Sequence, residues 1–180
     1  MPQLRNLAAA AALALVAFLP AAARAEATLK ETEQAIAALK KADPGLSGFF
    51  EKAAGYAVFP DVGKGGFIVG GAGGSGFLFE GGKAIGKTTM AQATVGAQIG
   101  GQTYVEVVFF ETREALAAFK KGEWTMAAQV SAVVVKSGAS ADAKYKDGIA
   151  VFTLPKAGAM AEASIGGQKF TFTPNGAKKK

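Results

Sequence analysis

The sequence contains no cysteine and no histidine among its 180 residues. Without cysteine the chain can form no disulfide bond and has no thiol nucleophile, and without histidine it cannot build a Ser-His-Asp triad. Metal sites built from nitrogen and sulfur ligands are excluded for the same reason. Carboxylates remain, but their spacing does not place two of them around a cleft. The composition therefore predicts a protein that is not an enzyme and uses no cofactor.

Long apolar runs are also scarce, and the one that stands out lies near the N-terminus. Leu7–Leu19 is unbroken, Arg5 precedes it, and Ala23-Arg24-Ala25 has the small-x-small pattern of a cleavage site. A transmembrane anchor would need about 20 apolar residues, and this run ends at Pro20. We therefore expect residues 1–25 to be a cleaved signal peptide. Attachment as a lipoprotein is excluded, because it requires a cysteine at the new N-terminus. The signal peptide predicts export, and a chain without cysteine fits the bacterial periplasm.

The chain that follows the predicted cleavage site is only modestly basic. Removing Arg5 and Arg24 leaves eighteen basic and fourteen acidic residues, a net charge of about +4. This excess permits attraction to an anionic surface but does not indicate nucleic-acid binding. The length from Glu26 onward suits one domain with a hydrophobic core. We expect that domain to span residues 26–174, followed by a basic tail at 175–180.

Three short segments have helical patterns. Thr28 and Glu31 match a capping box, and apolar residues recur at helical spacing up to Lys41. Asp43-Pro44 can start a second helix that ends near Gly55. Residues 112–121 form a third, with Leu116 and Phe119 on its inner face. All three are predicted to pack against other elements.

Strand patterns occupy most of the remaining chain. Gly55–Gly82 contains eleven glycines interleaved with large apolar residues, which favours closely packed strands over a polar linker. Residues 90–99 alternate strictly, residues 102–110 read as a return strand, and 124–134 alternate again. On the return strand, Glu106 is expected to be a hydrogen-bonded structural residue. The fold class predicted is α+β and β-rich.

Two double glycines suggest how the strands connect. Gly100-Gly101 and Gly166-Gly167 lie in the related segments IGGQTY and IGGQKF, and each pair is predicted to be a tight hairpin turn. With antiparallel strands and no alternation of strand and helix, we expect a twisted sheet that forms a sandwich or partial barrel, with the N-terminal helices packed on it. The alternative is an open antiparallel sheet with helices on one face.

Two glycine motifs resemble nucleotide-binding loops. Gly71–Gly76 fits G-x-G-x-x-G, and Gly81–Thr88 fits G-x-x-x-x-G-K-[ST], with Lys87 and Thr88 in the phosphate and magnesium positions. Each motif requires a helix directly afterwards, whereas here strand patterns continue. The prediction is that neither binds a nucleotide.

Several separated motifs together resemble one known family. They are GYAVFP at residues 55–60, VGKGGF at 62–67, VGAQIGGQ at 95–102, and EASIGGQKF at 162–170. In this order they are similar to the SYLF domain family of lipid-binding proteins, over about Leu29 to Phe172. The resemblance implies phospholipid binding, best described for eukaryotic members that recognise phosphoinositides and organise actin. We do not expect the actin-related role here, because an adjoining SH3 domain is absent.

The resemblance implies an anionic phospholipid or membrane surface as partner. Lysines beside glycine turns are candidates for the headgroup contacts, because the turns also expose backbone N–H groups; these are Lys64, Lys83 and Lys87. Four phenylalanines are candidates for covering acyl carbons, namely Phe67, Phe77, Phe49 and Phe50. Alternatively, these residues are ordinary turn and core residues, and the protein is a periplasmic structural or interaction module without a specific lipid.

Overall fold

The computed structural model describes residues 26–66, 69–95, 102–121, 123–126, 132–157 and 167–177. The predicted signal peptide lies outside the described residues. So do four residues named in the predictions above: Phe67, Gly100, Gly101 and Gly166. Within them the chain forms three helices and eight strands. The prediction of a β-rich α+β fold is confirmed.

The helices are α1 (Leu29–Ala42), α2 (Leu46–Lys52) and α3 (Arg113–Lys120). At the start of α1 the predicted capping box is present: the Glu31 backbone N–H donates to Thr28 Oγ1, and the Thr28 backbone N–H donates to Glu31 Oε2. Thr112 caps α3 in a similar way by accepting from the Ala115 N–H. In the described part of the chain, no helix has the length and apolar character needed to cross a membrane.

The strands are β1 (Gly55–Gly66), β2 (Val69–Glu80), β3 (Lys83–Val95), β4 (Gln102–Phe110), β5 (Glu123–Met126), β6 (Ala132–Val134), β7 (Ile149–Ala157) and β8 (Gln168–Pro174). They form one sheet in the order β5-β8-β3-β2-β1-β4-β7-β6. Every pair is antiparallel except β6 and β7, which are parallel. The predicted antiparallel sheet is therefore confirmed, apart from this one edge.

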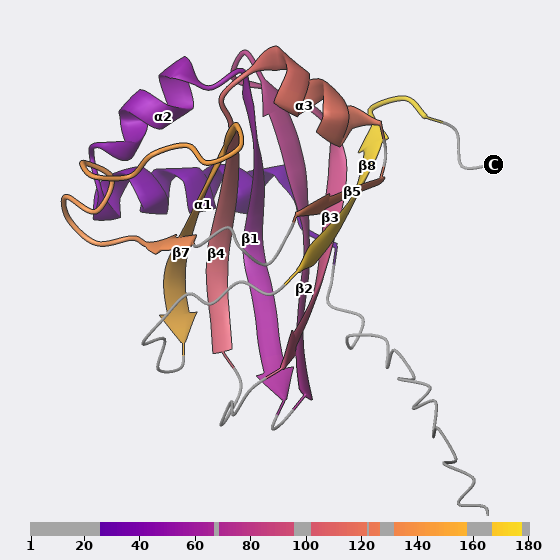
Figure 1. Cartoon of the computed structure of the whole chain (residues 1–180), viewed down its shortest axis with the longest axis horizontal. Coiled ribbons are helices and arrows are strands. Elements are labelled where there is room, and N and C mark those ends of the chain that lie inside the picture. Colours follow the sequence, from indigo (N-terminus) through magenta and orange to yellow (C-terminus); the bar gives the residue numbers. More distant parts are fainter. Residues whose placement is uncertain are drawn as a thin grey trace, which may run out of the picture.

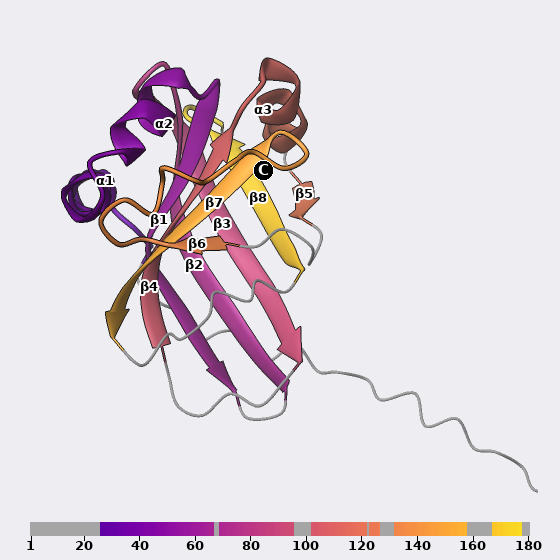
Figure 2. The same cartoon turned by 60° about the vertical axis from the view of Figure 1, so that its left-hand side comes forward.

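The sheet is strongly curled (Figures 1 and 2). Gln168 on β8 donates from Nε2 to Glu106 Oε1 on β4 at 3.0 Å, although three strands lie between β8 and β4. In a flat sheet, strands four steps apart would be separated by about 19 Å. The predicted partial barrel is confirmed in the form of a half-barrel, and the alternative of an open sheet is wrong.

Both faces of the half-barrel are buried. Its concave face holds an aromatic core that includes Phe59, Phe110 and Phe170, and Phe119 of α3 packs onto this core. The convex face is covered by α1 and α2, whose Leu39 and Leu46 lie in a second core cluster. Side chains along β4 alternate between the two clusters. The N-terminal helices therefore pack on the sheet as predicted.

The predicted hairpin at Gly100-Gly101 is wrong. The strands on either side, β3 and β4, are not neighbours, because β2 and β1 lie between them. For the second pair, Gly167 is exposed and its φ is not in the left-handed region, and β8 pairs with β3 and β5. A double glycine is a local pattern and does not determine which strands pair. A tight two-residue turn is found instead at Gly81-Gly82, where φ is 57° and 76°.

The predicted strand at 124–134 is also wrong as a single element. It contains β5 and β6, which lie at opposite ends of the strand order, and residues 127–131 between them are outside the described residues. Met126 and Ala132 are six residues apart, so their Cα atoms are at most about 20 Å apart. The two edges of the sheet are thus tied close together, as the curl requires.

Candidate functional site: a basic pocket beside helix α3

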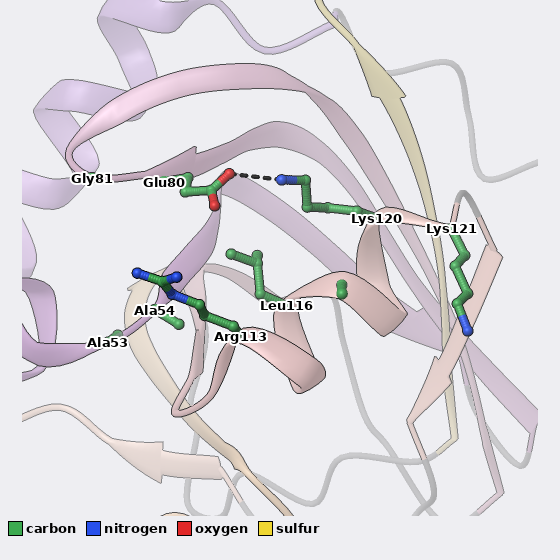
Figure 3. A pocket seen from close by; sticks show the side chains of 9 residues that line it. Ala53, Ala54, Glu80, Gly81, Arg113, Leu116, Lys120 and Lys121 are labelled. Carbon is green, nitrogen blue, oxygen red and sulfur yellow. Dashed lines mark hydrogen bonds and ion pairs between the residues drawn. The ribbon is translucent and has the colours of Figure 1, made fainter.

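A pocket of about 610 Å³ lies between α3 and the turn that joins β2 to β3 (Figure 3). We call it the α3 pocket. Its lining combines three cationic side chains, one carboxylate and small or apolar residues: Arg113, Lys120, Lys121, Glu80, Gly81, Ala53, Ala54, Leu116 and Ala117.

Helical spacing explains which side chains of α3 reach the pocket. Leu116 and Phe119 turn inward and are buried. Arg113, Ala117 and Lys120 follow one another at i, i+4 and i+7, so they share the other, exposed face. Burial of the inner face holds the helix on the half-barrel, and this in turn fixes the cationic face beside the β2–β3 turn.

The opposite wall of the pocket is the β2–β3 hairpin. Glu80 is paired with Lys83 across the Gly81-Gly82 turn. Positive φ at both glycines is typical of a two-residue type I′ turn. Neither glycine has a heavy atom within 4 Å of a Cβ built on it, so the surface of the turn is open.

The charges in the pocket are only partly balanced. Lys120 Nζ lies 2.7 Å from Glu80 Oε2, and both side chains are partly exposed, at 37% and 44%. Within the described residues, Arg113 and Lys121 form no ion pair. In Figure 3 the Lys121 side chain points away from Glu80 and Lys120, and Arg113 lies beside Ala53 and Ala54. A pocket with Arg113 beside a floor of alanine and leucine suits an anionic group that carries an apolar part.

The three predicted lysines do not form one patch. Lys83 is exposed and follows the turn at the pocket end of the sheet. Lys87 lies further along β3, and its Nζ is 3.0 Å from Glu26 Oε1. Lys64 pairs with Ala72 and Gln102 near the other end of β1. It lies eight residues beyond Tyr56, a rise of about 26 Å along the strand.

The predicted phenylalanines that the structure describes belong to the core of the convex face. Phe50 and Phe77 are each 9% exposed, and Phe49 packs against that cluster. The Phe49 ring centroid is 5.0 Å from that of Phe152. Phe67 lies outside the described residues. Phe49 and Phe50 pack α2 on the sheet, and Phe77 of β2 belongs to the same cluster.

Arg113, Lys120 and Lys121 were not among the residues predicted for the site. The prediction for residues 112–121 concerned only the inner face of a packing helix. The i, i+4, i+7 spacing of Arg113, Ala117 and Lys120 was available in the sequence. The contact between Lys120 and Glu80 could not be predicted from the sequence, because these residues are forty positions apart.

The concave core contains a polar group of three side chains. Gln168 Nε2 donates to both carboxylate oxygens of Glu106 and to Gln92 Oε1. Glu106 and Gln168 are fully buried. The nearby Tyr104 is also buried, and this burial, together with the charge of Glu106, raises the pKa of its phenol. The prediction of a hydrogen-bonded structural Glu106 is confirmed.

The two nucleotide-like motifs lie in the sheet. Gly71–Gly76 is part of β2, and Gly81–Thr88 comprises the hairpin turn and the start of β3. A phosphate-binding loop of this type needs a helix that begins at the lysine, so that its N-terminus points at the phosphates. Lys87 and Thr88 are instead strand residues with cross-strand partners Phe77 and Gly76.

Comparison with known proteins places the chain in a family. Residues 91–179 match the Ysc84 family, described as "Las17-binding protein actin regulator". The chain is also similar to "Beta cell expansion factor A" of Aeromonas veronii, with 33% identity over 81 residues. This match covers 45% of the chain and 31% of that relative, so it spans about a third of the relative's length. The resemblance to the SYLF family is confirmed over residues 91–179, which match the Ysc84 (SYLF) family.

Proposed function

We propose that the protein is exported and binds anionic phospholipid at a membrane surface of the cell envelope, with the α3 pocket receiving the headgroup. The observation that carries this proposal is Arg113, a cation that forms no ion pair among the described residues and lies beside the apolar floor of the pocket. The SYLF family, through its lipid-binding members, supports the choice of ligand. Export rests on the predicted signal peptide.

Headgroup binding in the α3 pocket makes use of both kinds of lining residue. Arg113 provides charge-assisted hydrogen bonds to phosphate oxygens, and Lys121, whose side chain points away from Glu80 and Lys120 in Figure 3, adds positive potential. The methyl groups of Ala53, Ala54 and Ala117 contact the carbon atoms next to the phosphate. Lys83, on the far side of the turn, adds to the positive potential without lining the pocket.

Vesicle co-sedimentation tests the function. The purified protein is mixed with phosphatidylcholine vesicles, with or without 30% phosphatidylglycerol, over a range of salt concentrations. We expect binding only to the anionic vesicles, and weaker binding as salt rises. The variant R113Q/K120Q/K121Q should bind more weakly, by about 1 kcal/mol for each charge removed near the surface.

Two further variants also remove three positive charges each and serve as controls for the α3 variant. K30Q/K136Q/K144Q alters exposed lysines outside the pocket and should bind like the wild type. K64Q/K83Q/K87Q tests the lysines chosen from the sequence; a greater loss in this variant than in the α3 variant would place the headgroup site on the strands. Equal binding to neutral and anionic vesicles would contradict the proposal.

A protein-binding module is the second candidate, and the family description favours it because it names a protein, Las17, as the partner of that family. This candidate predicts that the protein does not sediment with vesicles of either composition. The same experiment therefore separates the two functions.

A further inference from the structure

The lining of the α3 pocket contains a carboxylate, that of Glu80, among its cations. Glu80 is the last residue of β2, and its Oε2 lies 2.7 Å from Lys120 Nζ on α3. Figure 3 shows Arg113 across from this ion pair, beside Ala53 and Ala54. An anionic headgroup that is bound by Arg113 therefore lies in the same pocket as a negative charge of the protein.

Among the described residues, one cation without an ion pair lies beside the apolar floor of the pocket. Lys120 is neutralised by Glu80, and the Lys121 side chain points away from this pair. The Glu114 carboxylate is hydrogen-bonded at the start of α3 and does not line the pocket. This leaves Arg113, whose guanidinium can donate two parallel hydrogen bonds to one singly charged phosphate.

Phosphate headgroups fall into two classes that differ in charge. A phosphodiester carries one negative charge, whereas a phosphomonoester, with a second pKa near 6, carries about −1.5 to −2 at pH 7. Arg113 neutralises the diester, but the additional charge of a monoester is repelled by Glu80. Lys120 can move to the monoester only if it leaves the Glu80 carboxylate unpaired beside the same phosphate.

The carboxylate of Glu80 also offers a contact that a phosphodiester headgroup can use. The ion pair with Lys120 is made by Oε2. The other oxygen, Oε1, can accept a hydrogen bond from a hydroxyl group on the second substituent of the diester. A phosphomonoester lipid has no second substituent and lacks this donor. Charge and hydrogen bonding at Glu80 therefore favour the same class of headgroup.

We propose that Glu80 determines the specificity of the α3 pocket, so that the pocket takes singly charged phosphodiester headgroups in preference to phosphomonoesters. This inference rests on the proposed function and deepens it. Arg113 provides the attraction that both classes of headgroup share, and Glu80 provides the difference in affinity between them.

Vesicles of equal surface charge separate this preference from general electrostatic attraction. One set contains phosphatidylcholine with 30% phosphatidylglycerol, a diester. The other contains phosphatidylcholine with phosphatidic acid, a monoester, in the amount that gives the same zeta potential. Co-sedimentation of the purified protein at pH 7 measures the dissociation constant for each set. We expect the wild type to bind the phosphatidylglycerol vesicles more tightly, by about threefold or more.

The variant E80Q removes the charge of Glu80 and frees Lys120 for the phosphate. It should bind phosphatidic acid vesicles more tightly than the wild type does, by about fivefold, and lose the preference for the diester. E33Q removes the same charge from the exposed side of α1, outside the pocket, and should keep the wild-type ratio of dissociation constants. Because the Glu80–Lys120 pair is partly exposed, E80Q should fold normally, which a thermal melt checks.

The ratio of the two dissociation constants decides the outcome. If E80Q keeps the wild-type ratio, if E33Q loses it, or if the wild type prefers phosphatidic acid, the role of Glu80 in specificity is overturned while lipid binding stands. If the wild type sediments with neither anionic set more than with phosphatidylcholine alone, the proposed function itself fails.

Discussion

Gly76 is the residue at which one added methyl group would disturb the sheet most directly. A Cβ at this position would overlap the carbonyl oxygen of Val58. The two strands approach closely here because β1 shifts its register against β2 between Val58 and Gly63. Only a residue without a side chain fits.

We expect Gly76→Ala to lower the free energy of unfolding by about 1–3 kcal/mol through overpacking. Gly48 in α2 is the matched control, since a Cβ there meets no heavy atom within 4 Å. Gly48→Ala should stabilise the protein by about 0.5–1 kcal/mol through helix propensity. Urea unfolding followed by circular dichroism measures both values. A Gly76→Ala protein as stable as the wild type would show that the strands do not approach this closely.

Asp43 connects separate elements, because it lies at the junction of α1 and α2 and is hydrogen-bonded to a distant loop. Its Oδ1 accepts from the Gly45 N–H at 3.0 Å and its Oδ2 accepts from the Ser140 N–H at 2.7 Å. Burial acts to raise the pKa of Asp43, but these hydrogen bonds outweigh it and hold the pKa below its usual value. The ionised form of Asp43 therefore stabilises the fold.

Asp43→Asn should lower the free energy of unfolding at pH 7 by about 1.5–3 kcal/mol, because the buried N–H of Ser140 and the N–H of Gly45 lose a charged acceptor. The pKa is lowered by folding, so the contribution is complete above the ordinary Asp value of about 3.9 and is lost as the pH falls through the folded value. The stability difference between wild type and variant should thus narrow below about pH 4. Urea unfolding of both proteins at pH 7 and pH 2.5 measures this difference in the free energy of unfolding. The same difference at both pH values would contradict the stabilising role of the ionised carboxylate.

Elements whose signals are local could be predicted from the sequence, and their arrangement could not. Thr28 and Glu31 mark the start of α1, and Leu116 and Phe119 mark the inner face of α3, because capping and amphipathic spacing depend on a few neighbouring residues. The partners of β4 were predicted incorrectly, since pairing is decided by packing between distant segments. The α3 pocket was missed for the same reason: its walls meet only when α3 packs against the β2–β3 hairpin.

The hydrogen bond between Gln168 and Glu106 matters at the scale of the whole molecule, because it joins opposite walls of the half-barrel. Gln168→Leu removes a donor from a buried carboxylate and should lower the free energy of unfolding by about 2–4 kcal/mol. Lys169→Gln, one residue further along β8 and exposed, is the control and should change it by less than about 0.5 kcal/mol.

A double-mutant cycle identifies the cause of the loss. The variant Glu106→Leu/Gln168→Leu should be more stable than the sum of the two single changes implies, because it leaves no buried carboxylate without its donor. Additive losses would mean that the two side chains contribute independently and that the bond does not hold the walls together. Thermal unfolding of the four proteins provides the measurement.

The position of β8 has a consequence for the time at which the protein can fold. β8 is the last strand in the sequence, yet it lies between β5 and β3, where Thr88 Oγ1 donates to the Thr171 carbonyl oxygen 83 residues away. During synthesis β3 therefore has one unpaired edge until residues 168–174 have been made. Pairings over such long stretches of chain form slowly. A polypeptide that cannot complete its sheet early stays unfolded for longer, which is compatible with the proposed export of this chain through a narrow channel before folding.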